Sequence, residues 1–266
     1  MSRITAAPKT VVPKTTAQMP RNERRQIRPP EPTQLEPTKS EFGSHEHIML
    51  VLDRLDLCYG HDASPPGMYA TGEPLDGLIL TLLSQNTNDR NRDKAYDTLR
   101  SILPEWEDVA KAAAEKISAA IKPGGLADIK SARMKVILDR IYADFGEYSL
   151  AAMKDWPGGR VREYLRNLDG IGPKTVACVM VFDLGIPAFP VDTHVARVSR
   201  RLGWQSEKAS PEKIQDFLEA AVPPERCAGG HLNMIEHGRR VCHARNPQCG
   251  TCAVNDICRF GLGEAA

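Results

Sequence analysis

The sequence lacks any apolar run of the ~18 residues that a membrane-spanning helix needs. Its N-terminus also lacks the compact apolar segment of a secretory signal peptide, so we expect a protein that is not secreted. Reducing compartments keep thiols reduced, and the odd number of cysteines, seven, also argues against a framework of structural disulfides. Strand-like alternation of apolar and polar residues is nearly absent, which argues against a β-sheet.

Segments of helical length fill the chain from about Glu41 onward. Most show apolar residues three and four positions apart, and short Gly, Pro, Asp or Ser clusters separate them. Ser210 followed by Pro211 is typical of a helix start, and Gly203 of a helix end. With 41% hydrophobic residues the chain can bury a core, so we predict an all-α body of about ten helices.

The first 40 residues differ from the rest in charge. They hold eight Lys or Arg and three Glu, a net charge of +5, while the remainder of the chain has a net charge of −4. This segment also carries seven prolines and few large apolar side chains. We therefore predict a disordered, basic, Pro-rich tail over residues 1–42, which is either an arm for nucleic acid or a solubilising extension.

Four of the seven cysteines fall within seventeen residues near the C-terminus. Their spacing is C-x6-C-x2-C-x5-C, from Cys242 through Cys249 and Cys252 to Cys258. Four thiolates suit either a zinc ion or an iron–sulfur cluster, although the spacing lacks the paired CxxC knuckles usual for zinc. The residues alone therefore predict a metal centre and leave its identity open.

A tight turn between two helices reads LDGIGPKT, from Leu168 to Thr175. Gly170 and Gly172 permit the turn because glycine reaches positive φ at little cost, and Ile171 between them would anchor it in the core. Pro173 fits the first position of the next helix, whose uncovered amides form a seat for a phosphate. Such a helix–hairpin–helix element binds a nucleic-acid backbone without reading its sequence, although an ordinary helical hairpin has the same pattern.

Lys174 and Asp192 are the candidate catalytic residues. Lys174 lies in the first turn of a helix, where the dipole disfavours a cation and so favours a neutral, nucleophilic amine. Asp192 precedes another helix in VDTHVARV, where its simplest role is an N-cap. Across a cleft from Lys174, its carboxylate would also stabilise positive charge on a sugar while the amine captures C1′. The pair therefore suits cleavage of an N-glycosidic bond.

These motifs together resemble the endonuclease III family of helix-hairpin-helix DNA glycosylases, from about Pro74 to Cys258. The resemblance rests on LLSQNTND, GGLADIKSAR, LDGIGPKTVA, VDTHVARV, HGRRVC and the cysteine spacing. It implies a [4Fe–4S] cluster on the four cysteines, a Schiff base on Lys174 and catalysis by Asp192. It also implies a nucleotide flipped out of double-stranded DNA, with Leu126 as the wedge inserted beside the estranged base that the flipped nucleotide leaves behind. The implied contacts with DNA are Gln85, Asn86, Leu126, Gly170, Gly172, Thr175 and Arg245.

The resemblance also implies a two-lobed fold. A six-helix bundle would span residues 74–184, with the helix-hairpin-helix at about 163–183. The iron–sulfur lobe would be discontinuous, over 43–73 and 185–266. The chain departs from the family in two places. Asn86 stands where a glutamine usually fills the gap left by the flipped base, with Gln85 one residue early, and the loop between Cys242 and Cys249 has few cations.

We expect a bifunctional enzyme that removes oxidised pyrimidines and then acts as an AP lyase, as a monomer and with no membrane partner. A specificity for mismatched or methylated bases and a non-catalytic iron–sulfur DNA-binding protein remain alternatives. Lys174 argues against an adenine glycosylase, as does the lack of an acidic residue between Leu78 and Ser84. We expect a cytoplasmic, nucleoid-associated location in a bacterium, and the nucleus or an organelle in a eukaryote.

Overall fold

The computed structural model describes residues 41–62 and 72–264. These residues form helices and loops with no β-strand, which confirms the all-α prediction. The tail predicted over residues 1–42 lies, apart from its last two residues, outside the described part. The α-helices of the described part are α1 (His45–Tyr59), α2 (Pro74–Ser84), α3 (Asp89–Ile102), α4 (Trp106–Lys111), α5 (Ala114–Ile121), α6 (Ala127–Phe145), α7 (Gly158–Arg166), α8 (Pro173–Cys178), α9 (Thr193–Arg201), α10 (Pro211–Ala221) and α11 (Cys227–Arg240).

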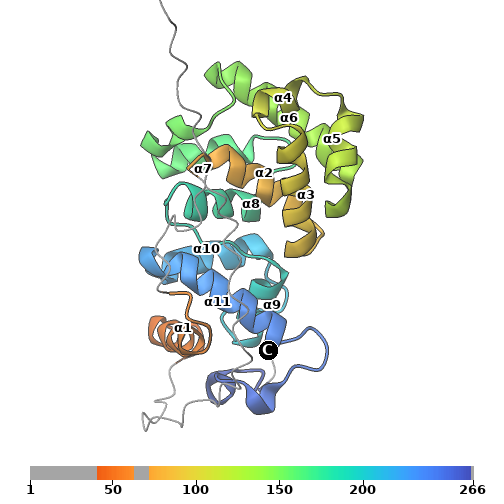
Figure 1. The fold of residues 1–266 in the computed structure, drawn as a ribbon. Helices are drawn as coiled ribbons and strands as arrows, with labels where there is room; N and C mark the ends of the chain where they lie inside the picture. The colour runs from red at the N-terminus through yellow and green to blue at the C-terminus, as the bar shows by residue number, and fades with distance from the viewer. Residues whose placement is uncertain (1–40, 63–71, 265–266) are drawn as a thin grey trace, which may run out of the picture.

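The helices form two groups, and one of these groups combines segments from both ends of the described chain (Figure 1). Helices α2 to α8 form one group, in which α2 packs against α3, α6 and α8. Helix α1 lies instead with the C-terminal half of the chain, where it packs against α11, and α11 packs against α9. The chain therefore crosses from the second group to the first after α1 and returns before α9.

Helix α2 forms the centre of the first group. Seven of its eleven residues are buried, so nearly every face of this apolar helix is covered by a neighbour. Gly77 lets the chain approach closely, because a Cβ atom at this position would lie 2.0 Å from the carboxylate oxygens of Asp183. Asp183 belongs to a π-helical turn, η3 (Val179–Asp183), that continues α8. The close approach at Gly77 thus fixes the helix after the hairpin against the centre of the bundle.

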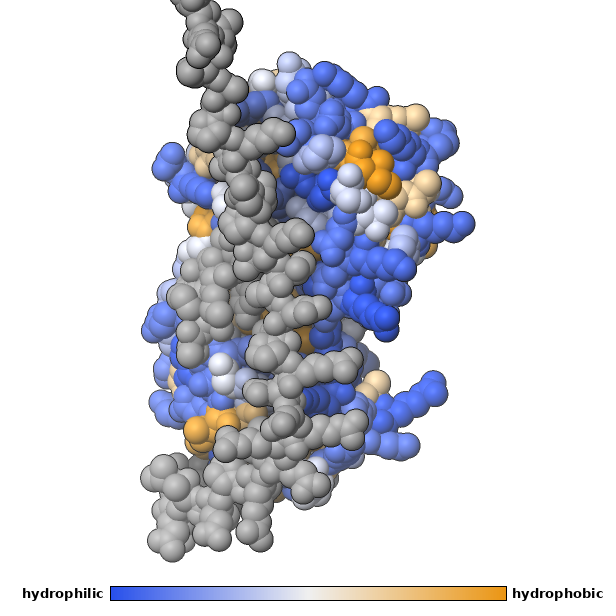
Figure 2. Space-filling model, viewed as in Figure 1, coloured by the Kyte–Doolittle hydropathy of each residue, from blue (hydrophilic) through white to orange (hydrophobic). Residues whose placement is uncertain are grey.

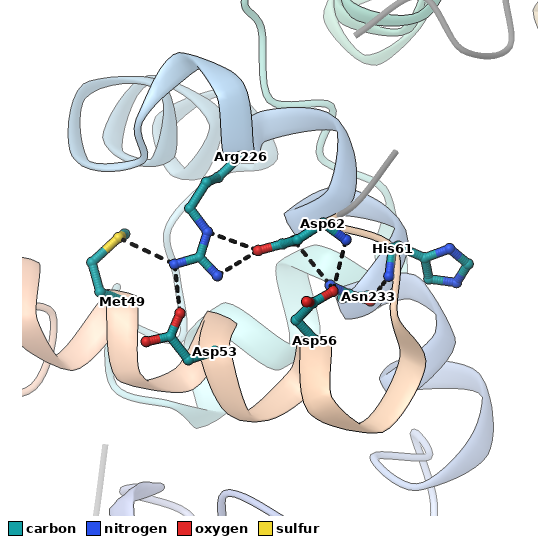
Figure 3. Close-up of polar contacts among 7 residues, drawn as sticks. All are labelled: Met49, Asp53, Asp56, His61, Asp62, Arg226 and Asn233. Carbon is teal, nitrogen blue, oxygen red and sulfur yellow. Dashed lines mark hydrogen bonds and ion pairs between the residues drawn. The ribbon is translucent and has the colours of Figure 1, made fainter. Parts of the chain in front are cut away.

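Helix α1 is held in the second group by a cluster of charges around Arg226 (Figure 3). The Arg226 guanidinium donates to Asp62 through Nε, at 2.7 Å, and through a terminal nitrogen, and it pairs with Asp53 at 2.7 Å. The Asn233 amide of α11 donates to Asp56 at 3.1 Å and to Asp62 at 3.0 Å. These bonds secure the end of α1 on α11 immediately before the connection to the first group.

On the face shown in Figure 2 hydrophilic residues predominate, and the hydrophobic ones form small, separate patches. None of the helices in the described residues combines the length and the apolar composition needed to cross a bilayer.

Candidate active site and iron–sulfur centre

The turn between α7 and α8 forms the predicted hairpin. Gly170 is in the left-handed region with φ of 70°, where an L side chain is strained, and Ile171 is 6% exposed and packed in the core. Gly172 differs from the expectation, because its φ of −89° is open to any residue. A Cβ atom on Gly172 would meet nothing within 4 Å, so its exposed amide face is open to a ligand. Only Gly170 therefore needs glycine for its backbone conformation.

Helix α8 begins at Pro173, so Lys174 occupies the second helical position, as the sequence predicts. The Lys174 side chain is half-buried, and it lies beside the thiol of Cys178, one turn further along the same helix. Burial raises the pKa of Cys178, and the charge and hydrogen bond of Lys174 oppose that shift. The lysine is thus held against its own helix at the edge of the bundle. Thr175, which follows it, is buried and gives its side chain no access to a ligand.

Asp192 is the N-cap of α9. Its Oδ1 atom accepts from the amides of His194 and Val195, each at 2.8 Å. Asp192 therefore caps the helix, which is the simplest role that the sequence predicts for it. Both bonds use one oxygen, and among the described residues none donates to Oδ2 in addition. A single carboxylate can thus cap the helix and still present a negatively charged oxygen to a substrate.

His231 of α11 connects the two candidate catalytic residues. Its ring is 2% exposed, and its Nδ1 atom lies 2.7 Å from the carbonyl oxygen of Pro190, which can only accept, so Nδ1 carries the proton. The pKa of His231 is lowered to about 4, mainly by burial and also by the Lys174 charge, and the Asp192 charge opposes this shift. The imidazole is therefore neutral at physiological pH, and the charges of both candidate residues act on it.

A pair of opposite charges joins the two groups of helices beside Lys174. The Asp89 carboxylate, at the start of α3, accepts from Arg239 of α11 at 2.8 Å. Burial raises the pKa of Asp89, but the hydrogen bond from Arg239 and the charges of Arg239, Arg92 and Lys174 outweigh it and hold the pKa below its ordinary value. The charge of Lys174 thus acts on both Asp89 and His231.

Two of the predicted DNA-contacting residues of the first group, Asn86 and Leu126, lie in exposed loops. Asn86 and Leu126 are exposed, and both have left-handed backbones, with φ of 53° and 51°. The wedge candidate, Leu126, leaves 48% of its surface exposed, so it does not serve core packing. Gln85 is half-buried, and its Nε2 atom donates to the carbonyl oxygen of Gly170 at 3.3 Å. The structure therefore separates the two candidates for the gap: Gln85 contacts the hairpin, and Asn86 is exposed.

The four C-terminal cysteines line one small, largely apolar pocket. Cys242 follows the end of α11. Cys249 begins a single helical turn, Cys252 follows that turn, and Cys258 follows another. All four thiols are free and half-buried. The four thiols surround one small space. A donor set made only of sulfur around such a space fits an iron–sulfur cluster.

Helix α9 links this centre to Asp192. Its Arg197 donates to the Cys242 carbonyl at 3.0 Å and to the Gly238 carbonyl at 3.0 Å. One turn later Arg201 donates to the Cys242 sulfur at 3.2 Å and to the carbonyl of His243 at 2.7 Å. Arg245, the predicted DNA contact of this loop, is exposed. One short helix thus carries the candidate carboxylate at its first end and supports the cysteine loop along its length.

Sequence reasoning missed His231 and the pair of Asp89 and Arg239. Their local sequence gives little signal, because a single histidine or charge on a helix is usually structural. The glycines before His231 are one indication, since a Cβ atom on Gly230 would lie 3.3 Å from Phe189 and one on Gly229 only 2.5 Å from Asp62. Such glycines show that α11 is approached closely on this side.

Comparison with known proteins agrees with this geometry. The model of the HhH-GPD superfamily of base excision DNA repair proteins matches residues 79–224, and the model of the iron–sulfur binding domain of endonuclease III matches residues 242–258. Endonuclease III of Thermotoga maritima is 34% identical over 206 residues, which cover 75% of this chain and 91% of that protein. In three dimensions, endonuclease III in a non-covalent complex with DNA has a TM-score of 0.70 at 28% identity, covering 83% of this chain and 97% of that one.

Two plant relatives match a shorter part. An Arabidopsis thaliana protein described as a candidate DNA glycosylase is 37% identical over 165 residues. These residues are 62% of this chain and 56% of that protein, so the chain spans little more than half of the length of this relative. The DNA glycosylase/AP lyase ROS1 of the same plant is 30% identical over 185 residues, 63% of this chain and 13% of that much longer protein.

The family models cover the hairpin, Lys174, Asp192 and all four cysteines, and the match to endonuclease III extends over most of both chains. The cysteine pocket fits the cofactor that the second model describes. The chain belongs to the endonuclease III family within the HhH-GPD superfamily, and it is a DNA-binding base excision repair glycosylase with a [4Fe–4S] cluster.

Proposed function

We propose that this glycosylase removes oxidised pyrimidines from double-stranded DNA and then cleaves the strand by β-elimination through a Schiff base on Lys174. The observation that carries the proposal is the common environment of Lys174 and Asp192. Both act electrostatically on the same buried imidazole, His231, although they come from different helices. An amine and a carboxylate that share one neighbour can contact the same sugar from two sides.

The chemistry follows from these two groups. The Lys174 amine attacks C1′ of the flipped nucleotide, the bond from C1′ to the base breaks, and the base leaves with the electron pair and takes up a proton. Asp192 stabilises the positive charge that develops on the sugar as this bond breaks. The amine nitrogen then loses a proton, and the bond from C1′ to the ring oxygen O4′ breaks, so that O4′ leaves with the electron pair and takes up a proton while a protonated imine forms at C1′. Loss of the 2′ proton breaks the bond from C3′ to its phosphate.

The remaining residues hold the DNA. The amides at the start of α8 and the exposed face of Gly172 would bind a backbone phosphate, because helix N-termini attract anions. Asn86 would fill the gap left by the flipped nucleotide, and Leu126 would insert beside the base opposite. The cysteine loop would present Arg245 to a phosphate. When bound, the cluster would order that loop, with Cys242, Cys249, Cys252 and Cys258 as its ligands. We propose that the protein does this work as a monomer.

One relative supports strand cleavage, since ROS1 is an AP lyase as well as a DNA glycosylase. A panel of duplexes tests both parts of the proposal, with thymine glycol, dihydrouracil, 5-methylcytosine, uracil or an abasic site at one position. We expect excision of thymine glycol and dihydrouracil and nicking of the abasic strand. Excision of 5-methylcytosine or uracil alone would overturn the proposed specificity.

Borohydride reduction tests the lyase step directly. Borohydride should trap the parental protein covalently on the abasic duplex, and Lys174→Ala should lose both trapping and nearly all nicking. DNA binding should stay within a few-fold, because other residues hold the backbone. A Lys174→Ala protein that still nicks at the parental rate would show that another amine is the nucleophile.

A further inference from the structure

Two exposed residues with strained backbones flank the proposed position of the flipped nucleotide. Asn86 and Leu126 have positive φ values, which cost a residue with a Cβ atom of order 1 kcal/mol or more. Such conformations persist only where the surrounding structure enforces them. Both loops must therefore be held by something stronger than their own backbone preferences.

The buried side chain of Lys130 connects the two loops. It is 1% exposed, and its ammonium donates to the Leu83 carbonyl at 2.7 Å and to the Gly124 carbonyl at 2.8 Å. Leu83 lies three residues before Asn86, and Gly124 lies two residues before Leu126. One ammonium thus joins the last turn of α2 to the loop that precedes α6.

The loop before α6 fits tightly against this point. A Cβ atom on Gly124 would lie 3.1 Å from the Cβ atom of Ala95 in α3 and 3.9 Å from the Leu83 oxygen. The Leu83 carbonyl is among the last four of α2, which have no partner within the helix and favour a cation. The glycine and the cation therefore bring the two loops together at one place.

Packing alone does not account for a lysine here. Burying an ammonium is costly, and the partners of Lys130 among the described residues are neutral carbonyls rather than a carboxylate. Burial lowers the pKa of Lys130 accordingly. A leucine or methionine would fill the space without that cost, but neither could join two carbonyl groups. The advantage of lysine is thus the fixed spacing of the two backbones.

We propose that Lys130 is a positioning residue that fixes the distance between Asn86 and Leu126, and so allows both to enter the duplex together when a nucleotide is flipped. This inference rests on the proposed function. If the two loops moved independently, one could enter while the gap beside the other closed. Lys130 should therefore matter for excision from a duplex and much less for reaction at a sugar that needs no flipping.

The same helix supplies a matched control. Lys135 donates its ammonium to the carbonyls of Ala110 at 2.6 Å and Ala112 at 2.8 Å, at the junction of α4 and α5. Lys130→Met and Lys135→Met each remove one ammonium from α6 and leave two carbonyls without that donor. Only the first pair of carbonyls belongs to the loops of Asn86 and Leu126.

The test compares single-turnover rates on two substrates, a thymine glycol in a duplex and an abasic site in single-stranded DNA. We expect Lys130→Met to slow excision from the duplex on the order of 10- to 100-fold, as a small misplacement does, and to change nicking of the single strand by less than about threefold. Lys135→Met should change neither rate. In a Leu126→Ala background, Lys130→Met should slow duplex excision much less, because the residue that it positions is already gone.

Three outcomes would overturn the proposal: equal losses on both substrates, equal losses in the two lysine variants, or full additivity with Leu126→Ala. Thermal unfolding checks that both variants fold. If Lys130→Met does not fold, Lys130→Gln is the second variant. Glutamine keeps an amide NH2 donor at this position, and the variant should still show the difference between the two substrates. A parental protein that is inactive on both substrates would instead refute the proposed function.

Discussion

The Gln85 side-chain amide donates to the carbonyl oxygen of Gly170 at 3.3 Å, across 85 residues of sequence. The bond joins the loop after α2 to the hairpin before α8, so the two proposed DNA contacts form one surface before any DNA is bound. The Gln85 side chain is thus occupied by a contact within the protein, whereas the next residue, Asn86, is exposed.

Substitution of these two neighbours should give different results. Asn86→Ala should slow excision and change its dependence on the base opposite the lesion, because Asn86 would contact that base in the gap. Gln85→Ala should loosen the hairpin and slow excision by a similar factor whichever base lies opposite. Single-turnover rates on thymine glycol opposite each of the four bases measure this. A change in opposite-base dependence with Gln85→Ala alone would reverse the assignment.

Much of this arrangement follows from sequence patterns that have local causes. The hairpin, the N-cap at Asp192 and the apolar helix α2 each depend on residues within one or two turns, so the sequence predicts them. The joint environment of Lys174 and Asp192 depends on His231, which is 39 residues beyond Asp192 in the chain. Nothing local to His231 shows which carbonyl or charge it will face.

The role of Lys130 was beyond prediction for the same reason. In sequence it is one of two lysines on its helix, and lysines are usually exposed. Its burial follows from the meeting of α2, α3 and the glycines before α6, which is a tertiary event. At Gly172 a local pattern predicts the wrong reason for a residue. The sequence suggests that glycine is needed there for positive φ, but the structure shows an extended backbone and an open face.

Asp192→Asn should separate the two jobs of this residue. Asparagine keeps an oxygen for the amides of His194 and Val195, so the N-cap and the thermal stability should be retained. The negative charge is lost, so excision of thymine glycol should fall on the order of 10²-fold or more. Nicking of a ready-made abasic site should fall less, since no base has to leave. An equal fall on both substrates would mean that Asp192 acts on the imine steps as well.

Removal of a cluster ligand should affect folding before it affects chemistry. Cys249→Ala should give protein with little iron, no yellow-brown colour and reduced solubility, because binding of such a centre is coupled to the folding of its loop. The parental protein should hold about four irons per chain, as a [4Fe–4S] centre requires. Iron analysis and the visible spectrum measure both. Cys227→Ala, at a buried cysteine outside the pocket, is the control and should keep its iron.

The stability of the fold should depend on pH through Asp183. Burial, with the nearby Asp76 carboxylate as a second cause, raises the pKa of Asp183 from 3.8 to about 7. Between these two values the folded protein keeps the proton and the unfolded chain releases it. The contribution of Asp183 to the free energy of unfolding therefore falls as pH rises through this window, by at most about 4 kcal/mol, and is constant above it.

Asp183→Asn removes this term, because an amide does not titrate. The variant should differ little from the parent in denaturant unfolding near pH 4, and it should become the more stable of the two as pH rises toward 8. Asp144→Asn is a suitable control: this exposed carboxyl has a pKa lowered by its hydrogen bond from Arg140, so its contribution is present above its ordinary pKa and lost in acid. A difference between parent and Asp183→Asn that stays constant from pH 4 to pH 8 would mean that Asp183 is charged throughout in the folded protein. The tight contact with Gly77 would then have to be stabilised by a donor other than a proton on the carboxyl itself.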